Sequence, residues 1–287
     1  MIFRWAIAGL LIAGAAGDAA CATMIAGSVS DEAGNPVPAA DVWAQWSTRC
    51  VQTRTDETGR FAFSDLPVGR VSVLVQKEGY ALDGRDLTIA GPGECAIVLA
   101  SDTDRVTFSM VDSSLEPVAG VRVKTLTIGG RVTVDVGVLE QAGFRLPRSD
   151  AAGKLILDGL PKGGYIGIRL GHALYEDEEL PRFPVGKEQD VLLRPGYRVR
   201  GRVTGPDGEG VANAHVRAFR VFEQGTRTYG DALTGPEGFY QCRLPKGEYQ
   251  FFAAHPDYAS PAVTRGRVEN DDGVICDFQL HQPHYLR

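Results

Sequence analysis

Histidines and carboxylates are the side chains of this sequence best suited to hold a metal or to move protons. The five histidines are His172, His215, His255, His281 and His284. His281 and His284 form a close pair around a proline at the C-terminus, which is typical of adventitious metal binding. His172 precedes the acidic run 175–179 (Tyr-Glu-Asp-Glu-Glu), which lacks the alternating ligands and turn glycine of a calcium loop. We therefore expect no metal site, and we expect this run to form a solvated hairpin tip.

Motifs of covalent and phosphate chemistry are absent from the sequence. It contains neither G-x-S-x-G nor H-E-x-x-H, and no glycine-rich phosphate loop opens a helix. Carboxylates are abundant on any acidic surface, so paired carboxylates alone do not indicate a glycosidase. We expect no catalytic residue and no cofactor, and we interpret the protein as a non-enzyme. An enzyme with an unrecognised site is the remaining alternative.

Sugar binding would require exposed aromatic rings with polar neighbours. Trp43 and Trp46 stand three residues apart in an expected strand, so their side chains face opposite sides. If Val42, Ala44 and Trp46 point inward, Trp43 points outward. Trp43 is therefore the candidate ligand-contact residue, and the alternative is that these rings only pack.

The N-terminus has the pattern of a secretory signal. Arg4 supplies a positive charge, an apolar run follows at 5–16, and Ala20-Cys21-Ala22 fits a cleavage site. The sequence thus predicts a signal peptide at 1–22 and export to the periplasm or the exterior. Acylation of Cys21, as in a lipoprotein, is disfavoured because Asp18 stands where such signals usually carry Leu. An uncleaved membrane anchor is a further alternative.

Length and charge limit the architecture and the partners. The chain has 287 residues, which suits two or three domains, and its 35 glycines and 16 prolines indicate many turns. The net charge of −6 argues against nucleic acid as a partner. No apolar segment after the signal is long enough to span a bilayer, so we expect no stable membrane span after cleavage.

One phrase occurs three times and divides the chain. L-P-x-G is found at 66–69, 160–163 and 244–247, and a glycine turn precedes each copy at Gly59, Gly153 and Gly238. A second phrase lies upstream with identical spacing, at Val37, Ala40 and Val42; at Val118, Val121 and Val123; and at Val211, Ala214 and Val216. The number of residues between successive copies of L-P-x-G is typical of a whole domain and too large for one unit of a solenoid. We predict domains at 24–100, 103–194 and 197–282, joined by short linkers.

Each copy reads as strands and turns rather than as helices. Segments such as 70–75 and 197–203 alternate apolar and polar residues, which is typical of half-buried strands. Such strands recur about every 8–12 residues between turn residues, which favours β-sandwiches. In the turn D-E-T-G, Asp56 can accept hydrogen bonds from backbone amides and Gly59 can take a positive φ. Phe61 and Phe63 then point inward, so the repeated phrase specifies shape and not chemistry.

The cysteines can be assigned by aligning the copies. Without Cys21, the chain retains Cys50, Cys95, Cys242 and Cys276, an even number that suggests two disulfides in an exported protein. Four cysteines allow three pairings. Cys95 and Cys276 occupy the same place in the last strand of the first and third copies, and the second copy has no cysteine, so each end domain holds one pair. We therefore predict the pairs Cys50–Cys95 and Cys242–Cys276.

The two phrases together resemble the carboxypeptidase regulatory-like domain. The resemblance rests on G-x-V-x-D-x-x-G-x-P-V-x-x-A-x-V at 27–42 and T-D-x-x-G-x-F-x-F-x-x-L-P-x-G at 55–69. It is good in the first and third copies and weaker in the second, where Leu115 replaces the turn glycine and 125–148 is a poorly matching insertion. The resemblance implies an all-β protein of three tandem Ig-like or transthyretin-like antiparallel sandwiches, related to carbohydrate-binding-like folds.

The resemblance implies an accessory module and not a catalytic one. We therefore expect an exported, non-catalytic binding or structural protein of the cell envelope, whose partner is an envelope protein or a polysaccharide. The alternative is a carbohydrate-binding protein with its site on one sandwich.

Overall fold

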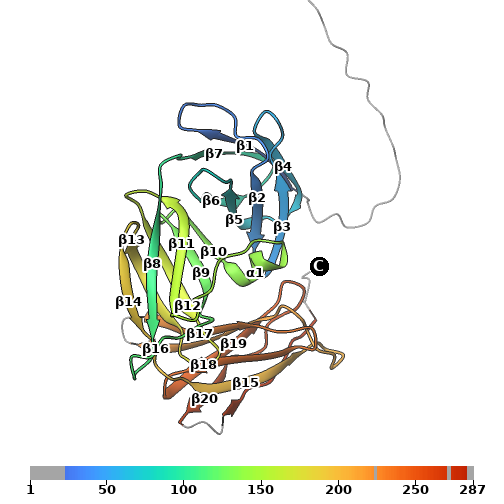
Figure 1. Cartoon of the computed structure of the whole chain (residues 1–287). Helices are drawn as coiled ribbons and strands as arrows, with labels where there is room; N and C mark the ends of the chain where they lie inside the picture. Colours follow the sequence, from blue (N-terminus) through green and yellow to red (C-terminus); the bar gives the residue numbers. More distant parts are fainter. Residues whose placement is uncertain (1–22, 223–224, 270–272, 283–287) are drawn as a thin grey trace, which may run out of the picture.

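The computed structural model describes residues 23–222, 225–269 and 273–282 and forms three β-sandwiches (Figure 1). The predicted signal peptide at 1–22, including Cys21, lies outside the described residues, as does His284. The first sandwich consists of β1 (Thr23–Asp31), β2 (Asp41–Trp46), β3 (Arg49–Arg54), β4 (Arg60–Leu66), β5 (Gly69–Gln76), β6 (Asp83–Ile89) and β7 (Gly93–Leu99).

The middle sandwich contains the one helix among the described residues. Its elements are β8 (Thr103–Val111), β9 (Arg122–Ile128), β10 (Val132–Asp135), α1 (Val136–Gln141), β11 (Lys154–Pro161), β12 (Tyr165–Gly171), β13 (Glu178–Pro184) and β14 (Glu188–Leu192). The third sandwich consists of β15 (Tyr197–Thr204), β16 (His215–Phe222), β17 (Gly225–Leu233), β18 (Phe239–Leu244), β19 (Gly247–Ala254), β20 (Thr264–Val268), β21 (Val274–Ile275) and β22 (Phe278–Gln279).

All three sandwiches share one topology, which confirms the predicted fold class. In each, the first strand lies between the fourth, which is antiparallel, and the end of the domain, which is parallel: β4-β1-β7, β11-β8-β14 and β18-β15-β21. In the third sandwich β22 also pairs with β15 in parallel. The facing sheets are β3-β2-β5-β6, β10-β9-β12-β13 and β17-β16-β19-β20. The repeated phrases therefore encode one chain path that is used three times.

The repeated turn has the conformation that its residues predict. Asp56 Oδ1 accepts hydrogen bonds from the amides of Thr58 at 2.8 Å and Arg60 at 2.9 Å. Gly59 has φ +72°, and a Cβ there would lie 2.5 Å from the carbonyl oxygen of Val29. Only glycine meets both demands without strain.

A buried hydroxyl ties this turn to the upstream phrase in every copy. The hydroxyl accepts the amide of the alanine or valine at the middle of that phrase and donates to the carbonyl of its first valine. The groups are Thr55 with Ala40 and Val37, Ser149 with Val121 and Val118, and Thr234 with Ala214 and Val211. Thus the two phrases recur together because one side chain joins them.

The middle sandwich departs from its neighbours where the sequence pattern weakens. Leu115 takes φ +63° at the turn where Gly34 and Gly208 have φ +85° and +83°. Residues 125–148 contain β10 and the short helix α1, which the strand pattern did not predict. Asp135 caps this helix by accepting the amide of Val138 at 3.2 Å.

Strand β5 is buried on both faces, and this corrects the prediction of a half-buried strand at 70–75. Ser72 and Leu74 are buried as well as the inward-facing Val71, Val73 and Val75. The reason is that the middle sandwich covers the outer face of the β3-β2-β5-β6 sheet. Leu74 accordingly belongs to the core cluster of the middle sandwich.

The predicted disulfides are wrong, and all four described cysteines are free. Cys50 lies opposite Gln45 on the outer face of its sheet and packs toward the middle sandwich, whereas Cys95 lies in the core of the first. Cys242 and Cys276 lie on either side of β15, which separates β18 from β21. Two strand spacings amount to about 9–10 Å, which exceeds the Cα separation of a disulfide.

We predict that these four thiols are present but slow to react in the folded protein. Burial raises the pKa of Cys50 and Cys242 to about 12 and that of Cys276 to about 11, so little thiolate forms. Alkylation without reductant, followed by peptide mass spectrometry, should modify all four in denaturant and few in buffer. A peptide pair linked through any two of them would contradict the structure.

Candidate functional site at the junction of the three sandwiches

Trp43 joins the first sandwich to the middle one. Its ring points out of its own sandwich, as expected, but it is only 3% exposed. Trp43 Nε1 donates to the carbonyl oxygen of Ala142 at 3.0 Å, and its ring meets Phe144 edge-on at 5.2 Å. The structure therefore places the predicted ligand-contact ring in an interface between sandwiches, where no sugar can stack on it.

Further polar contacts cross the same interface. Asp135 donates its backbone amide to Gln45 Oε1 at 3.0 Å, and Ser72 Oγ contacts the carbonyl oxygen of Thr133 at 3.0 Å. These bonds are formed by residues of β2 and β5 on one side and of β10 and the start of α1 on the other. They fix the position of Asp135 relative to the first sandwich.

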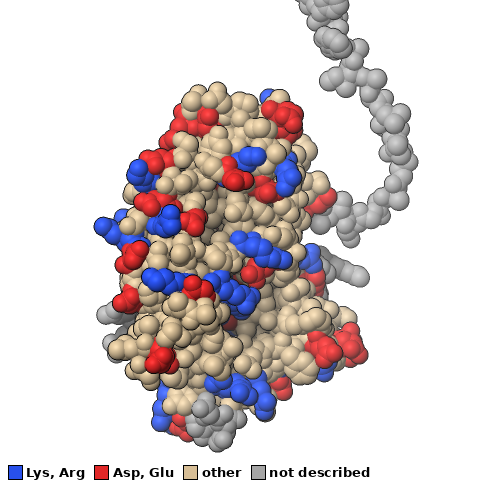
Figure 2. Space-filling view, in the orientation of Figure 1, with Lys and Arg blue, Asp and Glu red and all other residues tan. Residues whose placement is uncertain are grey.

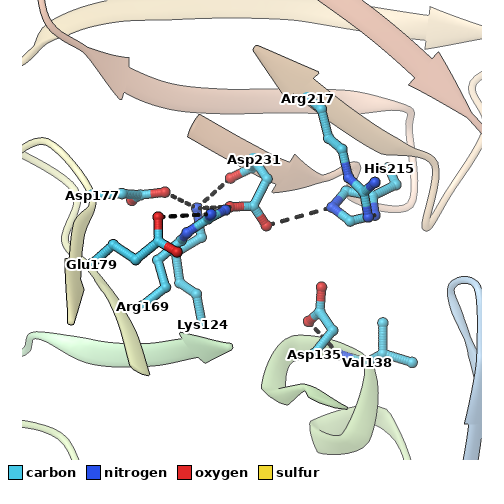
Figure 3. Close-up of polar contacts among 9 residues, drawn as sticks. All are labelled: Lys124, Asp135, Val138, Arg169, Asp177, Glu179, His215, Arg217 and Asp231. Atoms are coloured by element: carbon cyan, nitrogen blue, oxygen red, sulfur yellow. Dashed lines mark hydrogen bonds and ion pairs between the residues drawn. The ribbon is translucent and has the colours of Figure 1, made fainter. Parts of the chain in front are cut away.

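Lys124 joins the middle sandwich to the third. Its side chain is 10% exposed and lies between two carboxylates, with Nζ 2.7 Å from Asp177 Oδ2 and 3.0 Å from Asp231 Oδ1 (Figure 3). Nζ also contacts the backbone carbonyl oxygen of Asp231. Lys124 belongs to β9 and Asp231 to β17, so this ion pair spans the two sandwiches.

Burial and ion pairing act in opposite directions on these groups. Burial lowers the pKa of Lys124, but Asp231 and Asp177 outweigh it and keep the ammonium charged. Burial alone raises the pKa of Asp231, yet Lys124, His215 and Arg169 hold it well below its usual range. For Asp177 burial prevails over Lys124 and raises the pKa to about 6.

Arg169 and Glu179 extend the cluster. Arg169 Nη1 lies 3.3 Å from Asp231 Oδ1, and its Nη2 lies 3.3 Å from Glu179 Oε2. Burial lowers the pKa of Arg169, but Asp231 and Glu179 outweigh it, so the guanidinium stays charged. The second oxygen of Asp231 thus remains available for a different partner.

That partner is His215, which together with Asp135 forms a group of possible metal ligands. His215 Nε2 lies 3.4 Å from Asp231 Oδ2, and one ligand atom from each of Asp135, His215 and Asp231 fits within 4.8 Å. Asp135 points from the start of α1 toward the other two (Figure 3). Burial raises the pKa of Asp135, and His215 opposes the shift.

A cavity of about 520 Å³ opens at this point and is lined by all three sandwiches. Its lining includes Trp46 and Arg70 from the first, Thr133 and Asp135 from the middle, and His215 and Phe252 from the third. Clefts between domains are preferred ligand sites because they combine apolar walls with converging polar groups. No motif in the sequence directly indicates this cavity.

Few residues of this junction site could be predicted from the sequence. Asp177 lies in the run expected to be a solvated hairpin tip, but its side chain is 11% exposed, so that expectation is wrong for it. Lys124 alternates with the inward-facing Val123, so the strand pattern contains no sign that its side chain is buried. His215 was identified only as a histidine, because its acidic partners lie in other strands.

Other predicted positions lie away from the junction cavity. His172 packs beside Tyr175 with ring centroids 5.2 Å apart, and His255 Nδ1 lies 3.9 Å from Asp257 Oδ2. On the face shown in Figure 2, acidic and basic side chains are interspersed. Within the described ranges, no helix has the length and apolarity needed to cross a bilayer.

We predict that Lys124→Met strongly destabilises the protein. The change leaves Asp177 and Asp231 buried without their ammonium, which costs about 3–5 kcal/mol. Urea unfolding should show this loss, and adding Asp177→Asn should recover part of it by removing one buried charge. Lys162→Met is the matched control, because Lys162 is 58% exposed and pairs with Asp102 at the surface; it should cost about 0–1 kcal/mol. Equal costs for the two variants would contradict this role of Lys124.

Several solved structures are similar to this chain at a low level. The Bacillus anthracis TIE protein is 15% identical with a TM-score of 0.26, over 92% of this chain and 51% of that one. A streptococcal ancillary pilin is 14% identical with a TM-score of 0.27, over 91% of this chain and 99% of that one. BcpA, the major pilin subunit of Bacillus cereus, is 9% identical with a TM-score of 0.26, over 91% of this chain and 100% of that one. This chain spans about half the length of the Bacillus anthracis TIE protein. Likenesses at these TM-scores identify neither a function nor a partner.

No curated protein matches the chain.

A family model, the carboxypeptidase regulatory-like domain, matches residues 24–100 and 198–281, which together make up more than half of the 287 residues. The matched regions are the first and third sandwiches, as the sequence phrases predicted, and the middle sandwich repeats their topology. The chain belongs to the carboxypeptidase regulatory-like domain family.

Proposed function

We propose that the chain is an exported, non-catalytic binding or structural protein that acts at the cell envelope through protein or glycan contacts. The observation that carries this proposal is that two family modules are joined through a middle sandwich by buried contacts. Trp43 occupies one interface and Lys124 the other. Such an arrangement suits a stiff unit that holds its outer surfaces in fixed positions.

The bonding of the junction residues supports a non-catalytic role. Ser72 Oγ lies 2.6 Å from Asp86 Oδ1, and the hydroxyls of Thr127 and Thr133 lie 3.0 Å apart. His215 Nε2 faces Asp231 and not a hydroxyl. A hydroxyl nucleophile needs an effective base within hydrogen-bond reach. The carboxylate beside Ser72 is paired with Arg70 and is therefore a weak base. Export is supported by the signal pattern at 1–22.

The proposal can be tested on the full chain with a C-terminal epitope tag expressed in a bacterium. The mature protein should appear outside the cytoplasm and begin at Thr23, as read by N-terminal sequencing. Purified, it should bind envelope fractions saturably, with competition by untagged protein, and should not turn over envelope polymers. A chain that stays in the cytoplasm with residues 1–22 still attached would contradict export. Turnover of an envelope polymer would contradict a non-catalytic role.

Carbohydrate recognition is the second candidate function, and the junction cavity favours it. Trp46 and Phe252 are partly exposed rings on its wall, and Arg70 and Arg217 also line it. Rings that stack on sugars and charged groups that bond to hydroxyls are the usual components of such sites. The proposed sugar site therefore lies between the sandwiches and uses Trp46 rather than Trp43.

We predict that Trp46→Ala weakens binding to any polysaccharide that this protein retains. Loss of a stacking ring should lower the affinity about tenfold, which corresponds to about 1.4 kcal/mol. Phe239→Ala is the matched control, because Phe239 is an exposed ring, 57% accessible, outside the cavity lining. Affinity electrophoresis or isothermal titration would measure both. Equal affinities of Trp46→Ala and the parent protein would exclude this site.

A further inference from the structure

The ion cluster at the junction carries more negative than positive charge. Its carboxylates are Asp135, Asp177, Glu179 and Asp231, and the cations that pair with them are Lys124 and Arg169. Asp135 has no lysine or arginine within ion-pair distance among the described residues. Arg217 is exposed and contacts His215 rather than a carboxylate. An added divalent cation would balance the difference, because a charge in a partly buried site is stable only when it is paired.

The spacing of His215 and Asp231 fits two ligands of one ion. The 3.4 Å between Nε2 and Oδ2 is long for a hydrogen bond, whose usual length is about 2.9–3.0 Å. Two atoms bound tetrahedrally to zinc at about 2.0–2.1 Å lie about 3.3 Å apart. An oxygen of Asp135 completes a set of three ligand atoms that lie within 4.8 Å of one another.

Neighbouring groups orient these ligands. Lys124 and Arg169 both contact Oδ1 of Asp231, which leaves Oδ2 to face the proposed ion. Asp135 Oδ1 accepts the amide of Val138 at 3.2 Å, which leaves its second oxygen available. Partners of this kind fix ligand geometry in metal sites and raise affinity. The three ligands also line the junction cavity, so an ion can enter from solvent and keep an open coordination position.

We propose that Asp135, His215 and Asp231 form a binding site for a divalent transition-metal ion, with zinc the best fit. Imidazole together with two carboxylates suits zinc, whereas calcium requires six to eight oxygen ligands. Asp135 belongs to the middle sandwich, while His215 and Asp231 belong to the third. The ion therefore links two sandwiches in the wall of the junction cavity. This site is independent of whether the cavity takes a sugar.

Arg217 provides a specific consequence of this geometry. Its Nη2 lies 3.4 Å from His215 Nδ1. When Nε2 binds a metal, Nδ1 carries the proton and can no longer accept from Arg217, so the exposed guanidinium must turn away. Arg217→Met removes this competing donor and a nearby positive charge. Zinc affinity in that variant should be equal to or higher than in the parent.

The test uses the full mature chain, without a histidine tag, in which His281→Ala and His284→Ala remove the C-terminal pair. After treatment with a chelator, this reference protein is titrated with zinc by calorimetry, and with Co²⁺ by visible absorption. We expect one equivalent to bind and the apparent Tm to rise by several degrees. Asp135→Asn and His215→Gln should each weaken zinc binding at least about tenfold and abolish the rise in Tm.

Asp135→Asn is the decisive variant because asparagine still caps α1, so the fold is retained. His255→Ala is the matched control, since His255 also lies beside an aspartate but belongs to no group of three ligands among the described residues. Its zinc affinity should equal that of the reference. Absence of zinc binding in the reference protein would overturn the proposal. Unchanged binding in both Asp135→Asn and His215→Gln would overturn it equally.

Discussion

The buried ammonium of Lys124 is the constraint on which the junction depends. The Lys124 side chain is only 10% exposed, and a buried ammonium is stable only when it is paired with carboxylates. Each of two sandwiches contributes one carboxylate, Asp177 and Asp231. Because Asp231 must reach Lys124, strand β17 is held against β9. His215 in the neighbouring strand β16 is thereby brought to the space in front of Asp135. The contacts that neutralise this lysine thus help to position His215 and Asp231 in the wall of the cavity.

The middle sandwich is the element that joins the chain into one unit. Its departure from the family pattern, residues 125–148, forms β10, α1 and the segment that receives Trp43. The same segment places Asp135, which bonds to Gln45 of the first sandwich and faces His215 of the third. Thus the part of the sequence that fits the repeat least makes the contacts that the repeats cannot make alone.

The polar groups of the junction differ in how fully they are satisfied. Lys124, Arg169 and Asp231 bond to one another, and their pKa shifts keep all three charged. Asp135 and Asp177 are driven by burial in the opposite direction, toward protonation. A site with surplus carboxylates beside a histidine and an open cavity is suited to take up a cation. Stabilising contacts and a ligand site can therefore share the same residues.

The sequence by itself determined the sandwich fold, its threefold repetition and its turns. These depend on local rules: side-chain alternation along a strand, positive φ at Gly59 and Asp56 bonding to nearby amides. Tertiary structure alone decided which outer faces are covered, because a strand pattern cannot tell solvent from a neighbouring sandwich. Trp43 and Lys124 both point out of their own sandwiches, as alternation requires, yet both are buried. The cysteine pairs failed because two cysteines in one domain need not be close in space: β15 separates Cys242 from Cys276, and Cys50 faces out of the sandwich whose core contains Cys95.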